Sequence, residues 1–183
     1  MTSTPKMKPW IDAIHAYTPG KSKLDGIAEP VKLSSNENPL GPSPKAIAAM
    51  GAIAGQAHRY PDGASVALRE AIADLHGLEA DRIVCGTGSD EILQLLALAY
   101  ASVGDEVLFA RNSFMVYPIA ARRAGATPVE AADSDYAADV DALLAAVTPA
   151  TRVVYLANPN NPTGTLISAS EVRRLHAGLR SDI

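Results

Sequence analysis

Between residues 82 and 179, short apolar runs alternate with longer segments of helical periodicity, and this alternation limits the fold more than any other feature. The short runs, which we predict as strands, occupy residues 82–86, 106–110, 127–131 and 152–157. The helix-forming segments between and after them occupy residues 89–103, 113–124, 139–147 and 168–179. Strands that alternate with helices of this length form right-handed βαβ units. The sequence therefore predicts an α/β fold with a mainly parallel sheet.

The part of the chain before this alternation has a different character. Residues 1–43 show little periodicity and predict an irregular N-terminal arm. Helices are predicted at 44–54 and 65–76, with a turn cluster at 58–63 between them. We therefore expect two parts, an arm over residues 1–43 and an α/β portion over residues 44–183.

Composition excludes several classes of function. The net charge of -4 gives no electrostatic footprint for nucleic acid, and the most apolar stretch, residues 92–103, is too short to cross a bilayer. Cys85 is the only cysteine, which excludes an internal disulfide and fits a reducing compartment. The four histidines show no metal-ligand spacing. We expect a cytoplasmic protein without a metal site, a nucleic-acid partner or a membrane contact.

The loop at residues 85–91, Cys-Gly-Thr-Gly-Ser-Asp-Glu, lies between a predicted strand and a predicted helix. Its glycines permit tight turns, and the N–H groups that begin the helix can bind an anion such as phosphate. A plain glycine-rich turn capped by Ser89 is the structural alternative. Glu91 stands where a dinucleotide fingerprint has Gly or Ala, and the loop has no lysine for a P-loop. The charges of Asp90 and Glu91 weigh against a phosphate unless cations compensate them.

The loop at residues 156–164, Leu-Ala-Asn-Pro-Asn-Asn-Pro-Thr-Gly, follows the last predicted strand. Two prolines and a glycine stiffen it, so its asparagine side chains have fixed directions. A rigid asparagine can hold a ligand hydroxyl or phenolate by hydrogen bonding. An ordinary strand-to-helix connection with Asx-turns is the alternative.

This second loop resembles the Asn-Pro-Thr-Gly signature of aminotransferases that use pyridoxal 5'-phosphate (PLP). Three further segments, residues 14–22, 33–41 and 59–62, resemble in order motifs of the histidinol-phosphate aminotransferase family, and residues 86–91 occupy that family's phosphate-loop position. The Arg-Tyr-Pro-Asp motif at 59–62 also resembles threonine-phosphate decarboxylases. The resemblance covers nearly the whole chain. It implies the N-terminal portion of the large domain of fold type I PLP enzymes.

The resemblance also implies roles for single residues. Ser89 and the N–H group of Asp90 would hold the PLP phosphate, and Asn161 would donate to the ring oxygen of the cofactor. Phe114 takes a position where the family usually has a tyrosine that stacks on the pyridine ring, and a phenylalanine keeps the stacking. Tyr60 would reach across a homodimer interface toward the neighbour's cofactor phosphate.

The arm has an implied role as well, because Asn36, Glu37 and Asn38 would help to close it over substrate. The implied reaction exchanges an amino group between L-glutamate and imidazole-acetol phosphate, the keto form of L-histidinol phosphate, in histidine biosynthesis. Its substrates are small molecules: a phosphorylated amino alcohol and the glutamate/2-oxoglutarate pair. An aromatic aminotransferase and a threonine-phosphate decarboxylase-like enzyme remain as alternatives within the PLP enzymes.

The distribution of lysine limits what this chain can do. All six lysines fall in the first 45 residues, and none can take the place of the family's Schiff-base lysine, which follows the segment present here. We therefore expect no catalytic residue in this chain, an inactive and marginally folded product when it is isolated, and an unpaired strand at 82–86. A non-catalytic half-fold that binds or assembles is the alternative of another class. A nicotinamide-dependent dehydrogenase is disfavoured by Glu91 and by the Asn-Pro-rich loop.

Overall fold

The computed structural model describes residues 5–15, 21–23, 25–33 and 35–183, so that residues 16–20 and 34 of the two N-terminal motifs lie outside it. Its residues group into two compact units. The first unit contains residues 5–15 and 86–183, and the second contains the described residues between 21 and 85. The division into an arm over 1–43 and a domain over 44–183 stays a prediction. Within the described ranges, no helix is long and apolar enough to cross a membrane.

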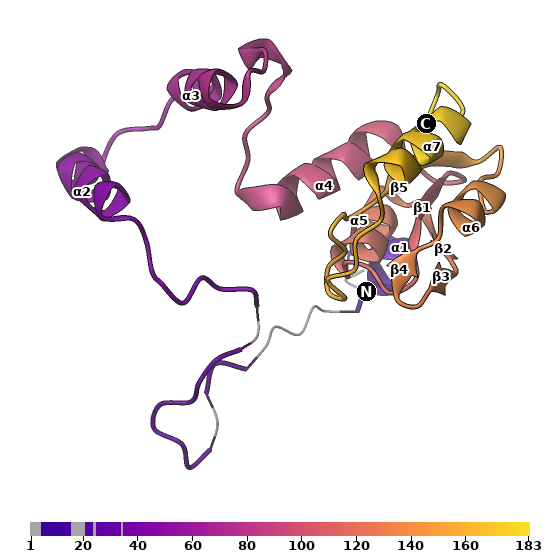
Figure 1. Ribbon diagram of the computed structural model, residues 1–183, viewed down its shortest axis with the longest axis horizontal. Helices are drawn as coiled ribbons and strands as arrows, with labels where there is room; N and C mark the ends of the chain where they lie inside the picture. Colours follow the sequence, from indigo (N-terminus) through magenta and orange to yellow (C-terminus); the bar gives the residue numbers. More distant parts are fainter. Residues whose placement is uncertain (1–4, 16–20, 24, 34) are drawn as a thin grey trace. The chain divides into compact units, whose positions relative to one another are not determined.

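A three-stranded parallel sheet forms the centre of the first unit (Figure 1). Strand β1 (Glu106–Ala110) lies between β2 (Thr127–Ala131) and β5 (Thr151–Tyr155). Both pairs are parallel, and Leu108 of β1 stands opposite Val154 of β5. The α/β class, the three strands and their parallel pairing agree with the sequence prediction.

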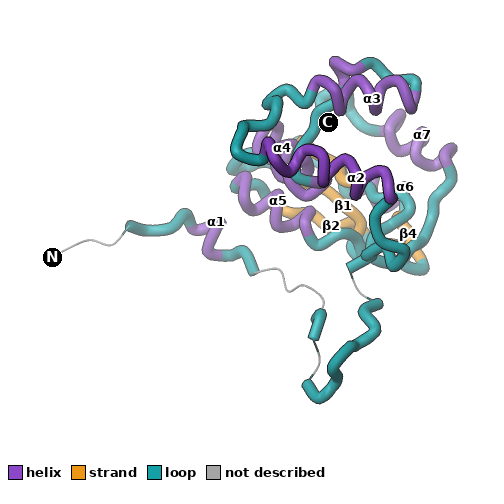
Figure 2. Tube along the Cα trace, turned by 90° about the vertical axis from the view of Figure 1, so that its left-hand side faces the viewer, coloured by secondary structure: helices purple, strands orange, loops and turns teal. Residues whose placement is uncertain are grey.

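Helices cover both faces of this sheet. One face carries α4 (Gly88–Tyr100) and α5 (Val116–Ala124), and the other carries α6 (Val140–Ala145) and α7 (Ala169–Gly178). Figure 2 shows the strands between α5 on one side and α6 on the other. A central strand that is buried on both faces requires apolar residues in both directions, which explains the continuous apolar run at residues 107–110 of β1.

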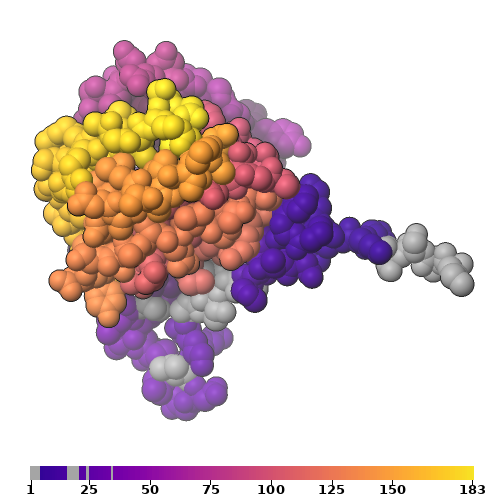
Figure 3. Space-filling model, turned by 90° about the vertical axis from the view of Figure 1, so that its right-hand side faces the viewer, coloured from indigo at the N-terminus to yellow at the C-terminus, as the bar shows by residue number. Residues whose placement is uncertain are grey.

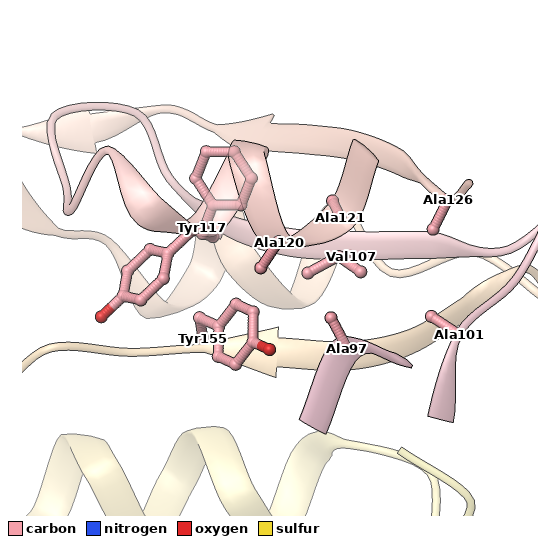
Figure 4. Packing of buried hydrophobic residues seen from close by; sticks show 9 residues of the cluster. Ala97, Ala101, Val107, Tyr117, Ala120, Ala121, Ala126 and Tyr155 are labelled. Atoms are coloured by element: carbon pink, nitrogen blue, oxygen red, sulfur yellow. The ribbon is translucent and has the colours of Figure 1, made fainter. Parts of the chain in front are cut away.

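Successive side chains of β1 point to opposite faces and so contribute to two hydrophobic clusters. Val107 and Phe109 face α4 and α5, whereas Leu108 faces α6 and α7. The helices on the first face contribute small residues to the contact with the sheet, and Figure 4 shows alanines of both helices near Val107. These alanines are Ala97, Ala101, Ala120 and Ala121.

The helix ends follow the capping signals in the sequence. The Asp139 carboxylate accepts hydrogen bonds from the N–H groups of Asp141 and Ala142 at the start of α6, and the Ser168 hydroxyl caps α7. Gly125 ends α5 with a φ of +84°, a left-handed conformation that favours glycine.

The second unit contains α2 (Pro44–Ile53), α3 (Val66–His76) and two short 3₁₀ helices, η1 (Ala54–Gln56) and η2 (Ala80–Arg82). Its helices confirm the sequence prediction within one residue. Ala73 is the one buried hydrophobic residue in the described part of this unit, and the apolar side chains of α2 are exposed. The unit therefore has little core of its own.

The strand predicted at residues 82–86 does not form, whereas the prediction that this segment lacks a partner strand agrees with the described sheet. Residues 80–82 form η2, and Ile83 has extended dihedral angles but pairs with no strand among the described residues. Val84 keeps 75% of its surface exposed. An apolar run becomes a strand only when a neighbouring strand accepts its hydrogen bonds, and none is available here.

Two small elements were not predicted. Strands β3 (Asp133–Ser134) and β4 (Ala137–Ala138) form a hairpin whose two turn residues both have positive φ. Helix α1 (Pro9–Asp12) packs on α5, and the Trp10 indole lies against Gly125. Figure 3 shows this indigo segment against the later residues of the first unit.

Candidate functional site

Two loops that carry predicted site residues leave the same edge of the sheet. Residues 111–115 follow β1, and residues 156–167 follow β5. Because parallel strands end at a common edge, these loops lie side by side at their carboxyl ends, where ligands of open α/β sheets bind. Phe114 belongs to the first loop and Asn161 to the second.

A row of three aromatic rings connects this edge to α4. The Tyr155 hydroxyl, at the end of β5, donates a hydrogen bond of 2.5 Å to the Leu93 carbonyl of α4. The Tyr155 ring stacks on Tyr117 with centroids 4.8 Å apart, and Phe114 meets Tyr117 edge-on at 5.8 Å. Burial raises the pKa of Tyr155 to about 12 and also raises the pKa of Tyr117. Both hydroxyls therefore stay protonated at neutral pH, and the row fixes the loop of Phe114 against α4.

The glycine-rich loop leads into the first turn of α4. A Cβ atom at Gly86 would lie 2.8 Å from the Glu91 carboxylate, so a larger residue at this position would displace the Glu91 side chain. Gly88 begins the helix with a φ of +79°. The Glu91 carboxylate accepts hydrogen bonds from the N–H and the hydroxyl of Thr87 at 2.6 and 2.8 Å, and these bonds lower the pKa of Glu91. Glu91 thus holds the loop closed.

Ser89 and Asp90 occupy the exposed first turn of α4. The Asp90 carboxylate accepts a hydrogen bond from Gln94 one turn later in the helix. Within the described residues, no acceptor pairs with the backbone N–H of Ser89 or of Asp90, as expected for a first turn. These two N–H groups and the Ser89 hydroxyl form a set of donors that an anion can use.

The three asparagine side chains of the second loop differ in their hydrogen-bond partners. Asn158 closes the loop, because its amide exchanges two hydrogen bonds of 3.0 Å with the backbone of Ile167. Asn160 is 7% exposed and donates to the Asn112 carbonyl and to the Thr163 hydroxyl. Asn161 is half-buried, and its side chain has no hydrogen-bond partner among the described residues. Asn161 is therefore the amide of this loop that a ligand can engage.

A cavity of about 520 Å³ opens beside Phe114. Its lining includes Arg111 and Glu130, which carry opposite charges, and the loop residue Thr163. It contains none of the other first-unit residues proposed to contact a cofactor, namely Ser89, Asp90 and Asn161. The cavity therefore adjoins the predicted site through Phe114 alone.

The remaining predicted residues lie in the second unit. Glu37 accepts a hydrogen bond of 2.7 Å from the Lys32 ammonium, and Asn38 accepts one of 3.0 Å from the Leu40 N–H. Asn36 adopts a positive φ of 52°. Tyr60 is fully exposed, and its hydroxyl has no partner in the described part of the chain. The first three residues thus shape a turn of the arm, and Tyr60 is free for an outside contact.

Sequence analysis did not single out Asn160, Asn112 or the threonines at 163 and 165, which hold the edge together. The clustered asparagines and threonines were the available signal, but the sequence does not tell which amide points inward. Among the described residues, no group of three metal-binding side chains lies together.

The comparisons with known proteins agree with this geometry. Residues 28–181 match the family model described as aminotransferase class I and II. The histidinol-phosphate aminotransferase of Erythrobacter litoralis (strain HTCC2594) is 62% identical over 179 residues, which cover 98% of this chain and 48% of that protein. The enzyme of the same name from Paramagnetospirillum magneticum is 55% identical over 181 residues, which cover 99% and 50%.

Two solved structures show the same fold. Histidinol-phosphate aminotransferase from Sinorhizobium meliloti, in complex with pyridoxal-5'-phosphate, matches with a TM-score of 0.82 at 24% identity over 98% of this chain and 49% of its own. A putative histidinol-phosphate aminotransferase from Erwinia carotovora atroseptica matches with a TM-score of 0.76 at 31% identity over 91% and 48%. The chain spans about half the length of the curated relatives it matches. Since the family model covers most of its residues, the chain belongs to the class I and II aminotransferases.

Proposed function

We propose that these residues are part of a histidinol-phosphate aminotransferase, which transfers an amino group between L-glutamate and imidazole-acetol phosphate in histidine biosynthesis. The observation that carries this proposal is the 62% identity with a protein of that name over nearly the whole chain. Full-length protein here means a chain of its relatives' length that contains these residues. A cytoplasmic location belongs to the same proposal and is supported by the single cysteine.

The first unit fits the phosphate and the ring of PLP. A phosphate needs hydrogen-bond donors, and the first turn of α4 offers the unpaired N–H groups of Ser89 and Asp90. The neighbouring carboxylates of Asp90 and Glu91 already accept hydrogen bonds from Gln94 and Thr87. The free amide of Asn161 suits the ring oxygen of the cofactor, and Phe114 offers an aromatic ring for stacking.

When it is bound, PLP supplies an electron sink for the negative charge that develops as a substrate loses a proton. The residues present here would bind and orient the cofactor: Ser89 and Asp90 would hold its phosphate, Asn161 would donate to its ring oxygen, and Phe114 would cover its ring. No lysine occurs between Lys45 and Ile183, so this segment supplies no amine to the site. We therefore expect the 183 residues alone to catalyse no amino transfer.

A homodimer is the second part of the proposal. Tyr60 is fully exposed, and the apolar side chains of α2, including Met50 and Ile53, keep more than half of their surface exposed. A second copy of the protein would bury these residues and would bring Tyr60 near the phosphate donors of its partner. Sedimentation of the full-length protein as a monomer at micromolar concentration would refute this part.

Substrate choice is tested by comparing kcat/KM of the PLP-loaded full-length protein for three amino donors with 2-oxoglutarate as acceptor. We expect L-histidinol phosphate to exceed L-phenylalanine and threonine phosphate by at least tenfold. A preference for the aromatic amino acid, or release of carbon dioxide from threonine phosphate, would establish one of the two alternative enzymes instead.

Two variants in one loop test the assignment of Asn161. Asn161→Ala removes an amide without a protein partner, so it should weaken PLP binding at least tenfold and leave the unfolding free energy unchanged. Asn158→Ala removes two hydrogen bonds to the backbone of Ile167 and should lower the unfolding free energy by about 1–3 kcal/mol. PLP titration and urea unfolding of both variants give the comparison. The reverse pattern would contradict the assignment.

A further inference from the structure

We infer that Asn160 is a positioning residue, which holds the loop that presents Asn161 to the loop that presents Phe114. The inference rests on the proposed function, because these two residues are its proposed cofactor contacts. Asn160 itself does not need to touch the cofactor. Its role follows from four hydrogen bonds and from its burial.

The Asn160 side chain is fully engaged as a donor. It is 7% exposed, and its amide nitrogen donates to the Asn112 carbonyl and to the Thr163 hydroxyl, at 2.8 Å each. A side-chain amide has two N–H donors, so both are used. The bond to Asn112 spans 48 residues of sequence and joins the loop after β5 to the loop after β1.

The backbone of Asn160 is fixed as well. Its N–H donates to the Thr165 carbonyl, and its carbonyl accepts from the Gly164 N–H, at 2.8 Å each. Main chain and side chain therefore hold the residue in one orientation. A buried amide with all of these bonds satisfied is a rigid anchor, whereas an unsatisfied one would be costly.

The partners of Asn160 extend the network to a third segment. The Asn112 amide donates to the Asp133 carboxylate at 2.6 Å, at the start of the β3–β4 hairpin. The hydroxyls of Thr163 and Thr165 both lie within 3.0 Å of the Tyr136 carbonyl in the same hairpin. Asn160 thus stands where the two strand-end loops and the hairpin meet.

The proposed cofactor contacts are close to this anchor along the chain. Asn161 is the next residue after Asn160, and Phe114 follows Asn112 by two residues. Consecutive Cα atoms are about 3.8 Å apart, so both contacts lie within about 8 Å of an anchored backbone atom. Without the Asn160 bridge the two loops can separate, and the cofactor must then bring them together at the expense of its affinity.

Two substitutions distinguish the effect of the two N–H donors of the Asn160 side chain from the effect of its volume. Asn160→Ala removes the amide and leaves the Asn112 carbonyl and the Thr163 hydroxyl without their donor. Asn160→Asp keeps the shape but replaces the two donors with an acceptor that faces the Asn112 carbonyl. If the N–H donors of Asn160 hold the two loops together, both variants should loosen the loops to the same extent.

Thr151→Val is the matched control. Thr151 is fully buried, and its hydroxyl also takes part in two hydrogen bonds, with Thr148 and Glu106. It lies at the first residue of β5, at the opposite end of the strand from Asn160. Its loss should lower stability without loosening the loops.

Hydrogen–deuterium exchange of the full-length protein without cofactor tests the link directly. We expect both Asn160 variants to raise the exchange rate at least tenfold in peptides that cover 111–117 and 158–167. Thr151→Val should leave these peptides unchanged. Unchanged exchange in 111–117 in the Asn160 variants would overturn the inference.

PLP titration of the same proteins tests the positioning role. Both Asn160 variants should weaken PLP binding at least tenfold, and Thr151→Val less than twofold. Raised exchange with unchanged affinity would show a structural link only and would overturn the positioning role. Wild-type protein that fails to bind PLP would refute the proposed function instead, and the exchange result would still decide whether Asn160 links the loops.

Discussion

Replacing Tyr155 with phenylalanine should have opposite effects on stability at neutral and at alkaline pH. The Tyr155 side chain is 6% exposed, and its hydroxyl donates to the Leu93 carbonyl. Phenylalanine keeps the ring and its stacking on Tyr117 but loses this hydrogen bond. At pH 7 the variant should therefore be less stable than wild type by about 1 kcal/mol.

Alkaline pH adds a second effect in wild type alone. Burial raises the pKa of Tyr155 to about 12, above the value near 10 of an unfolded tyrosine. Because the folded protein binds the Tyr155 proton more tightly than the unfolded chain does, the protonated tyrosine stabilises the folded state. This stabilisation is complete below pH 10 and is lost as the pH rises through 12. The loss at pH 12 is about 2 kcal/mol, so the two proteins should be equally stable between about pH 10 and 11. Above that range the phenylalanine variant should be the more stable one.

Urea unfolding followed by circular dichroism at several pH values between 7 and 12 measures this difference. Tyr117 is present in both proteins, so the comparison reports the effect of replacing Tyr155. Tyr100→Phe is the control, since Tyr100 is 66% exposed and its hydroxyl has no partner in the described residues. It should change stability by less than about 0.5 kcal/mol at pH 7. A Tyr155→Phe deficit that stays constant across this pH range would refute the reasoning.

Three further substitutions test the core, a helix cap and a tight contact, all by urea unfolding at pH 7. Leu108→Ala leaves a cavity at a fully buried position of the central strand and should lower the unfolding free energy by about 2–5 kcal/mol. The control Leu166→Ala, at a residue 69% exposed, should lower it by less than about 1 kcal/mol. Asp139→Ala removes the two cap bonds of α6 and should cost about 1 kcal/mol, and an unchanged urea midpoint would contradict this capping role. Gly125→Ala should cost at least about 1 kcal/mol, because its φ is +84° and a methyl group would lie 2.9 Å from Val103; equal stability would refute the contact.

The regular elements of the first unit could be predicted because their signals are local. The alternation of short runs with helical segments predicted β1, β2 and β5, and Asp139, Ser168 and Gly125 lie at the ends of helices. Residues 82–86 also form an apolar run, and their lack of a partner was expected, but without the hydrogen bonds of a neighbouring strand they form no strand among the described residues. The β3–β4 hairpin was missed because strands of two residues leave too short a pattern.

The candidate site was predictable to a smaller degree. The resemblance pointed to Ser89, Asp90 and Asn161, and the structure gives each of them unpaired donors. The residue pattern of the loop alone does not distinguish Asn161 from Asn160, because both are asparagines and only the folded loop buries one of them. The resemblance gave no sign of Tyr155, whose role depends on a contact with Leu93, 62 residues away in sequence.

The most direct test of the central claim is a crystal structure of the full-length protein with PLP. The account predicts that the phosphate accepts hydrogen bonds from the N–H groups of Ser89 and Asp90, and that the Asn161 amide donates to the ring oxygen. A cofactor bound elsewhere, or one whose phosphate does not contact the first turn of α4, would contradict it.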